Sequence, residues 1–210
     1  MSSKLGCMAT IDSASMPMAS EQPKAGRLVV LSGPSGSGKS TLVERTLAQG
    51  DLRVRRSISA TTRSPRPGEV DGEHYHFWSE AQFDEAIKQG RFLEYANVYD
   101  HRYGTLHSEV DSYLKQGLCV LLEIDVQGAT QIRQRCQDCV LVFLKASSAA
   151  DYARRIRQRP NETGADLQRR IQAAQTELAH ASAYDHVVIN DDLDAAAHQF
   201  HDLLKNICGG

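Results

Sequence analysis

Short apolar runs alternate with amphipathic stretches from Arg27 to the end of the chain. This order is typical of a parallel β-sheet covered by helices, because each helix returns the chain to the edge where the next strand begins. The runs that fit strands are residues 28–32, 54–59, 118–125, 140–144 and 186–190. The pattern therefore predicts an α/β fold around a central five-stranded parallel sheet.

Several residue pairs carry signals for helix ends. Ser79 with Gln82, and Ser108 with Asp111, resemble the capping boxes that begin helices. Gly50 follows an amphipathic stretch, where a glycine commonly ends a helix. We expect helices to begin after both serines and to end before this glycine.

Two regions interrupt the alternation of strands and helices. Residues 57–108 are rich in Arg, Tyr, His, Gly and Pro, and residues 148–170 are rich in arginine. Insertions at the carboxyl ends of parallel strands usually form binding lobes or lids. We therefore expect one domain over residues 27–210, made of a core (27–56, 109–147 and 171–210), a binding lobe (57–108) and an arginine-rich helical lid (148–170).

The first 26 residues are small and polar and have no helical or strand period, which predicts a flexible tail. An organellar transit peptide is the alternative, but Asp12, Glu21 and the absence of arginine count against it. Met16 or Met18 as the true start also stays open.

Composition limits the partners. With 24 Lys and Arg against 26 Asp and Glu, the chain has no global basic field for nucleic acid. It has no apolar run of about 20 residues, so we expect no membrane partner. Its five scattered cysteines do not resemble a disulfide framework and favour a cytoplasmic location. Oligomeric state, including a homo-oligomer, stays open.

The strand at residues 28–32 runs into Gly-Pro-Ser-Gly-Ser-Gly-Lys-Ser-Thr, a match to the phosphate-binding P-loop. Its glycines let successive N–H groups converge on phosphate oxygens, Lys39 adds a cation, and Ser40 adds a hydroxyl for Mg²⁺. A turn without a ligand is the alternative, but the strand before and the helix pattern after it favour nucleotide binding. The predicted ATP-binding residues here are Gly33, Pro34, Ser35, Gly36, Ser37, Gly38, Lys39, Ser40 and Thr41.

Two acidic residues end the apolar run at 118–125. Asp125 is our candidate for the Mg²⁺ shell, and period-2 alternation puts Glu123 on the same face. A helix cap or turn is the alternative for Asp125.

The segment after residue 57 carries a candidate anion clamp. Arg63 and Arg66 lie in a turn with two prolines, and their forked donors suit a small dianion. Tyr75 can add a hydroxyl donor. Ordinary surface pairs with Glu69 and Asp71 are the alternative.

Five segments together resemble the guanylate kinases in order and spacing: SISATTRSPRPGEVDGEHYHF, FLEYANVYDHRYGT, LLEIDVQG, QRRIQAAQTELAHA and VVINDDLD. The resemblance covers residues 27–206. It implies a three-layer P-loop fold, a GMP-binding lobe with its own small mixed or antiparallel sheet, and transfer of the γ-phosphoryl group from ATP to GMP with Mg²⁺, in purine nucleotide metabolism and GMP recycling.

The resemblance also implies roles for individual residues. The phosphate of GMP, or of dGMP, would contact Arg63, Arg66, Tyr75 and Tyr103. The guanine would contact Ser59, Glu94 and Thr105, with Glu123 nearby. Lys39, Arg63, Arg155, Arg159 and Arg170 would be catalytic, and Asn190 would contact adenine.

Two other functions stay open. One is a non-catalytic guanylate-kinase-like module that binds proteins, although such modules often have degraded P-loops and this one is intact. The other is a related kinase with another phosphorylated acceptor, such as a ribose bisphosphate. A sugar phosphate has no base edge for Glu94 to recognise, which makes this alternative less attractive.

Overall fold

The computed structural model describes residues 26–157 and 164–209, so the expected tail lies outside it except for Gly26. The strands are β1 (Leu28–Ser32), β2 (Val54–Arg56), β3 (Ala60–Thr61), β4 (His76–Phe77), β5 (Phe92–Val98), β6 (His101–Leu106), β7 (Cys119–Glu123), β8 (Val140–Lys145) and β9 (His186–Ile189). The α-helices are α1 (Lys39–Leu47), α2 (Glu80–Lys88), α3 (Asp111–Lys115), α4 (Val126–Arg135), α5 (Ala149–Arg157), α6 (Gly164–Leu178) and α7 (Leu193–Cys208).

The larger sheet has five parallel strands in the order β2-β7-β1-β8-β9, which confirms the predicted central sheet. Each predicted strand range matches one observed strand, although β8 continues one residue past its range, to Lys145. Strand β9 ends one residue before its predicted range, at Ile189, and two strands end earlier still: β2 stops at Arg56 and β7 at Glu123. There the chain leaves the sheet, because the residues that follow enter the lobe and helix α4.

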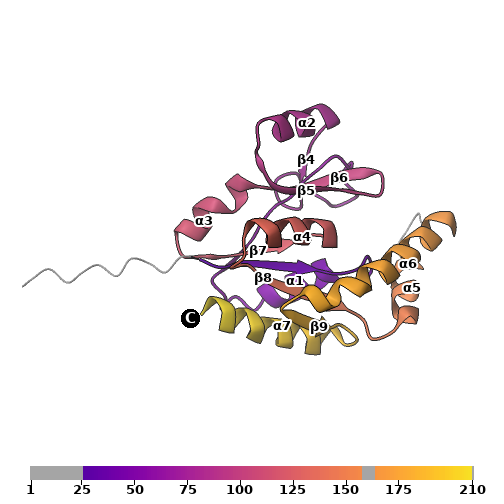
Figure 1. Ribbon diagram of the computed structural model, residues 1–210. Helices are drawn as coiled ribbons and strands as arrows, with labels where there is room; N and C mark the ends of the chain where they lie inside the picture. Colours follow the sequence, from indigo (N-terminus) through magenta and orange to yellow (C-terminus); the bar gives the residue numbers. More distant parts are fainter. Residues whose placement is uncertain (1–25, 158–163, 210) are drawn as a thin grey trace, which may run out of the picture.

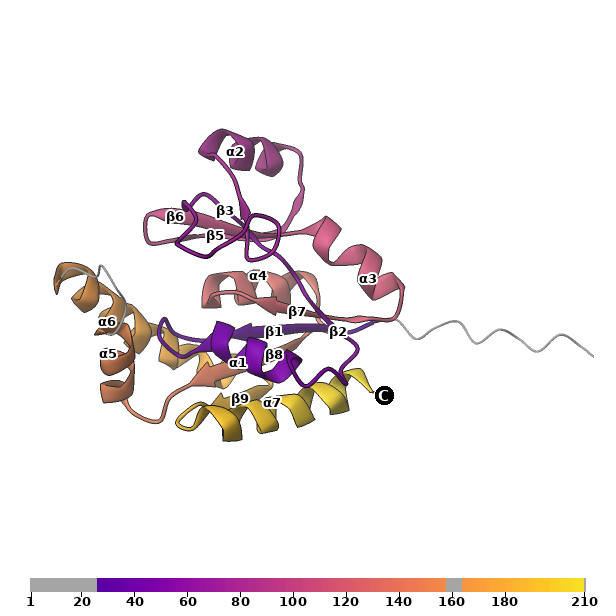
Figure 2. The same ribbon diagram turned by 180° about the vertical axis from the view of Figure 1, so that it is seen from behind.

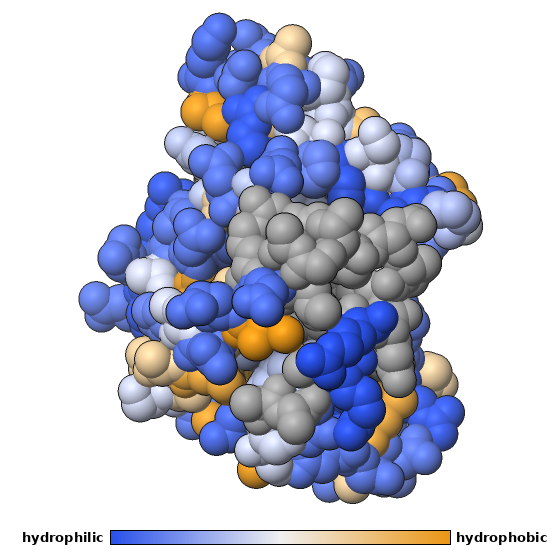
Figure 3. All heavy atoms as spheres, turned by 90° about the vertical axis from the view of Figure 1, so that its right-hand side faces the viewer, coloured by the Kyte–Doolittle hydropathy of each residue, from blue (hydrophilic) through white to orange (hydrophobic). Residues whose placement is uncertain are grey.

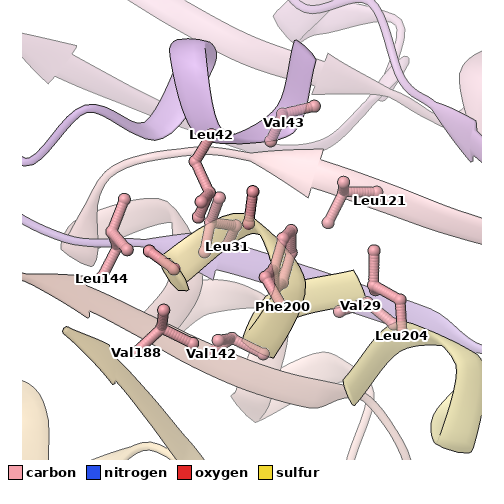
Figure 4. Close-up of a cluster of buried hydrophobic side chains, with 12 residues drawn as sticks. Val29, Leu31, Leu42, Val43, Leu121, Val142, Leu144, Val188, Phe200 and Leu204 are labelled. Carbon is pink, nitrogen blue, oxygen red and sulfur yellow. The ribbon is translucent and has the colours of Figure 1, made fainter. Parts of the chain in front are cut away.

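Helices cover both faces of this sheet and make three layers (Figures 1 and 2). On one face, Leu42 of α1 and Phe200 of α7 pack against Leu31 of β1 (Figure 4). On the other face, Ile132 of α4 packs with Val30. Every residue of β1 is buried, which explains why its sequence is continuously apolar rather than alternating.

Residues after β2 form a separate small sheet in the order β4-β3-β6-β5, which lies beyond α4 in Figure 1. The pair β3–β4 is parallel, and the pairs β3–β6 and β5–β6 are antiparallel. Helix α2 packs on this sheet through Phe83, which stacks on Phe92 with ring centroids 4.5 Å apart. The predicted mixed sheet of the lobe is confirmed.

The arginine-rich segment contributes α5 and the start of α6, which lie at one side of the core sheet (Figure 1). Tyr152 of α5 packs with Ala146, Ile171 and Leu178. Viewed from this side, the described surface is mostly hydrophilic (Figure 3). The predicted helical character of this segment is confirmed for its described residues, and residues 158–163 lie outside them.

The two predicted capping boxes have different outcomes. Ser79 and Gln82 form a complete box at the start of α2, with each side chain bonded to the other's backbone N–H. The second prediction is wrong: Ser108 lies inside a 3₁₀ turn, and α3 begins after Val110 without a side-chain cap. A capping serine needs an extended backbone, which the 3₁₀ turn does not provide.

The cysteines do not resemble a disulfide framework in the sequence, and the structure contradicts that interpretation for one pair. Cys119 at the start of β7 and Cys208 at the end of α7 form a disulfide, with Cα atoms 5.8 Å apart. These residues are 89 positions apart in sequence, so their spacing contains no sign of the contact. Among the described cysteines, Cys136 and Cys139 are free.

In the described part of the chain, no helix is both long and apolar enough to cross a membrane.

Candidate active site

A cleft of about 400 Å³ lies between the carboxyl end of the core sheet and the lobe. Most of the predicted site residues line it: Ser35, Gly36, Gly38, Lys39, Ser40, Thr41, Ser59, Arg63, Arg66, Tyr75, Glu94, Tyr103, Glu123 and Asp125. The fold thus brings the P-loop and the candidate anion clamp to one space, although they come from different parts of the sequence.

The P-loop connects β1 to α1, and two of its glycines are required by close contacts. Gly33 has φ 146°, and a Cβ there would lie 2.1 Å from the carbonyl oxygen of Leu144. Gly38 has φ 90°, and its Cβ would lie 2.6 Å from the Nδ2 atom of Asn190. Larger residues would therefore strain the backbone and collide with β8 or with the loop after β9.

Lys39 and Ser40 begin helix α1, where the backbone N–H groups favour an anion. The Nζ atom of Lys39 donates to the carbonyl oxygens of Gly33 at 2.6 Å and Pro34 at 3.4 Å. The hydroxyl of Ser40 donates to the Oε1 atom of Glu123 at 2.5 Å. The P-loop hydroxyl is thus already joined to the end of β7.

Two residues from the last third of the chain, Arg155 and Asn190, donate hydrogen bonds to the backbone of the P-loop. The carbonyl oxygen of Ser37 accepts from Nδ2 of Asn190 at 2.8 Å and from Nη1 of Arg155 at 3.4 Å. Arg155 also donates to the carbonyl oxygen of Asn190 at 2.6 Å. Of the other predicted lid arginines, Arg159 lies outside the described residues, and only the backbone of Arg170, in α6, is described.

Glu123 and Asp125 lie where β7 gives way to α4. The Oδ1 atom of Asp125 caps α4 by accepting from the N–H of Gly128 at 2.8 Å, so the cap considered in the sequence is present. Its Oδ2 atom accepts from Gln127 at 3.2 Å, and burial raises the pKa of this carboxyl. The hydroxyl of Ser40 and these carboxylates are hard oxygen donors of the kind that Mg²⁺ prefers.

Arg63 makes a bidentate salt bridge with Glu69. Its two terminal nitrogens lie 2.9 and 2.8 Å from the two carboxylate oxygens, and the side chains are only 10% and 17% exposed. The Arg63 guanidinium holds the pKa of the Glu69 carboxyl below its usual range. Glu69 also accepts from the N–H of Arg66 at 2.6 Å, so one carboxylate fixes the turn that carries both arginines.

Two tyrosines complete the acceptor side of the cleft. The rings of Tyr75 and Tyr103 meet edge to face, with centroids 5.9 Å apart. Burial, followed by the nearby Glu123 carboxylate, raises the pKa of Tyr75 to about 12. Its hydroxyl therefore stays protonated at neutral pH and can donate to an anion.

Glu94 is a buried carboxylate in the lobe, only 3% exposed. Its Oε1 atom accepts from the N–H of Thr105 at 2.9 Å and from the Thr105 hydroxyl at 2.7 Å. Burial raises the pKa of Glu94 to about 7, and the hydrogen bonds from Thr105 oppose that rise. Thr105 is not among the residues that line the cleft, so it acts on Glu94 rather than facing the space itself.

Three carboxylate or arginine side chains that line the cleft, those of Glu44, Arg56 and Glu69, received no site role from the sequence. Glu69 was considered only as a surface partner, and Arg56 received no role, yet both line the cleft. The Nη2 atom of Arg56 lies 2.8 Å from Oε2 of Glu123. One signal was available for Arg56: it is a charged residue inside the predicted core strand at residues 54–59, whose carboxyl end lies at the edge where ligands bind.

Comparisons with known proteins agree on one family. The family model described as guanylate kinase matches residues 25–207. The chain is 42% identical to a guanylate kinase of Rickettsia felis, covering 85% of this chain and 93% of that one, and 42% identical to a guanylate kinase of Rubrobacter xylanophilus, covering 89% and 97%. A crystal structure of guanylate kinase from Anaplasma phagocytophilum superposes with a TM-score of 0.73 at 28% identity and covers 89% of this chain. This chain therefore belongs to the guanylate kinase family.

Proposed function

We propose that this protein transfers the γ-phosphoryl group of ATP to GMP, giving ADP and GDP, with dGMP as a second acceptor. The observation that carries the proposal is a single cleft with a P-loop on one side and a buried carboxylate beside an arginine clamp on the other. The P-loop suits the phosphates of the donor. The clamp and Glu94 suit an acceptor that has both a phosphate and a base.

Glu94 is proposed to read the guanine, with Ser59 beside it. An ionised carboxylate only accepts hydrogen bonds, and its two oxygens match the N1–H and N2–H₂ donors of guanine side by side. Adenine has an acceptor at N1 and no donor at C2, so it would offer the carboxylate no matching donor. In the structure both bonds from Thr105 go to Oε1, which fixes the orientation of the carboxylate.

The phosphate of GMP is proposed to lie against Arg63, Arg66, Tyr75 and Tyr103. Most GMP is a dianion at neutral pH, because the second pKa of a phosphate monoester is near 6. The acceptor therefore needs no general base to become a nucleophile. Glu69 supports this site by holding the turn of Arg63 and Arg66, and Arg63 must share its donors between Glu69 and the incoming phosphate.

The phosphates of ATP are proposed to bind the N–H groups of the P-loop and Lys39. Ser40 and Asp125 are the proposed ligands of Mg²⁺, with Glu123 adjacent. When bound, the ion would neutralise charge on the phosphates during in-line transfer. Lys39 adds a mobile cation to the group that is transferred.

The lid arginines 155, 159 and 170 are proposed to close over the phosphates and exclude water, which would otherwise hydrolyse ATP. Asn190 is proposed to contact adenine. Its Oδ1 atom is buried and has no hydrogen-bond partner in the described structure. The proposed compartment is the cytoplasm, and the Cys119–Cys208 disulfide is the observation that counts against it, because such bonds are rare in a reducing compartment.

One assay tests the proposed function. ADP release from ATP is measured with GMP, dGMP, AMP, UMP and a ribose bisphosphate as acceptors. We expect rapid ADP release with GMP, slower release with dGMP and little with the others. ADP release that does not depend on GMP, or that is fastest with a ribose bisphosphate, would contradict the proposal.

Lys39 separates an enzyme from a binding module that has the same fold. We predict that Lys39→Met lowers kcat by about a hundredfold or more, because its charge matters most as negative charge redistributes during transfer. GMP affinity, measured by calorimetry, should stay near the parent value because Lys39 lies on the donor side. A variant with normal kcat would show that this loop is not catalytic.

A further inference from the structure

Arg56 connects the two sides of the cleft through Glu123. It is the last residue of β2, an edge strand, and its Nη2 atom lies 2.8 Å from Oε2 of Glu123 on the adjacent strand β7. The other oxygen of Glu123 accepts from the hydroxyl of Ser40 at 2.5 Å. Three side chains from β2, β7 and α1 thus form a continuous chain of polar contacts.

The negative charge of Glu123 lies where it would affect the binding of phosphate groups in the cleft. Its side chain is only 11% exposed, and it lines a cleft that has to hold the phosphates of two nucleotides. An unpaired carboxylate there would repel both, and repulsion is strong where water is scarce. Arg56 cancels that charge and also holds the carboxylate in one orientation, since its other oxygen stays on Ser40.

Arg55, the preceding residue, shows what an ordinary arginine on this strand does. Successive side chains of a strand point to opposite faces. Arg55 lies over the ring of Tyr113 at 4.4 Å and is 3.9 Å from Glu109, and it is not among the residues that line the cleft. The two arginines therefore differ in what they can reach although they are neighbours in sequence.

We infer that Arg56 is a positioning residue of this site: it keeps Glu123 paired and turned toward Ser40, so that the acceptor's phosphate dianion can enter the cleft. The inference rests on the proposed function. Arg56 acts through Glu123 and needs no contact with substrate.

A double-mutant cycle tests this dependence. GMP affinity is measured by calorimetry without ATP or metal, and kcat and KM by ADP release, for the parent, Arg56→Leu, Glu123→Gln and the double variant. We expect Arg56→Leu alone to weaken GMP binding about tenfold to a hundredfold, because it leaves a buried charge unpaired. In the Glu123→Gln background the same Arg56→Leu change should weaken GMP binding by less than about threefold, because no carboxylate charge remains to neutralise.

Two further variants separate positioning from a general loss of structure. Arg55→Leu removes an arginine from the same strand and should leave GMP affinity and kcat at the parent values. Arg56→Lys keeps the positive charge and should restore most of the affinity. If Arg56→Leu melts well below the parent, Arg56→Gln, which keeps a polar donor, takes its place in the cycle.

The outcomes distinguish the inference from the proposed function. An equal loss of GMP affinity in both backgrounds would overturn the inference, because Arg56 would then act independently of Glu123. No loss in either background would overturn it as well. If the parent itself does not phosphorylate GMP, the proposed function fails. If the parent is active and the cycle is additive, only the inference about Arg56 fails.

Discussion

Glu94 is a carboxyl group whose ionised form the folded protein disfavours. It is almost fully buried, and a Cβ on Gly128 would lie 2.4 Å from its Oε2 atom, so the backbone of α4 closes tightly over it. Burial raises its pKa to about 7 from a usual value of 4.5. If this carboxyl group recognises guanine in its ionised form, then keeping it ionised in the folded protein lowers the free energy of unfolding.

That loss of stability predicts a pH-dependent effect of Glu94→Gln. As pH rises from 4.5 to about 7, the unfolded chain releases this proton while the folded chain still holds it, so the parent loses stability. Glutamine has no proton to lose and keeps the acceptor for Thr105. The free energy of unfolding of the variant should match the parent at about pH 4.5 and exceed it by on the order of 2 kcal/mol at about pH 8. Urea denaturation at several pH values measures this, and a pH-independent difference would contradict it.

Helix α4 links the nucleotide-binding core to the lobe. Asp125 caps its first turn. Gln131, in the middle of the helix, pairs with the backbone of Tyr95 on β5: it donates to the carbonyl oxygen at 2.7 Å and accepts from the N–H at 3.4 Å. Strand β5 is an edge of the lobe's sheet, so these bonds occupy backbone groups that no neighbouring strand uses. One helix thus sets the position of the lobe relative to the P-loop.

Removing the hydrogen bonds between Gln131 and Tyr95 should make the lobe more mobile and leave the ATP-binding side of the cleft unchanged. We predict that Gln131→Ala raises KM for GMP about threefold to tenfold, in line with the loss of one or two hydrogen bonds, and leaves ATP affinity unchanged. The amide of Tyr95 should exchange its hydrogen faster. Gln134→Ala, an exposed glutamine of the same helix, is the control and should behave as the parent. Equal effects of both substitutions would argue against the link.

At the scale of the whole molecule, local signals predicted the sheet and the P-loop because both depend on short runs of sequence. The run at residues 28–32 was placed as the structure has it, since a buried strand and the turn after it are read from adjacent residues. Contacts between distant segments were not predictable in this way. The Arg56–Glu123 pair and the Cys119–Cys208 disulfide join residues 67 and 89 positions apart. The pairing of β2 with β7 brings the first two together, and the packing of α7 on the sheet brings the two cysteines together.

The disulfide closes a long loop, so it should stabilise the folded chain mainly by restricting the unfolded one. Reduction with a thiol reagent should lower the free energy of unfolding by about 3–5 kcal/mol, the range for a loop of this length. Cys208→Ala should make thermal unfolding insensitive to the reagent, while Cys136→Ala should leave the sensitivity intact. If the melting temperature of the parent is the same with and without the reagent, the disulfide does not stabilise the fold.

The cleft is proposed to join phosphoryl transfer to the recognition of guanine through Glu94. The most direct measurement is the ratio of kcat/KM for GMP to kcat/KM for AMP, compared between the parent and Glu94→Gln. Sites that hydrogen-bond a substrate reject a partner lacking the match by roughly 10⁴-fold, so we predict that the ratio falls by about a thousandfold or more in the variant, mainly through loss of GMP efficiency. A variant that still prefers GMP as strongly as the parent does would contradict the account.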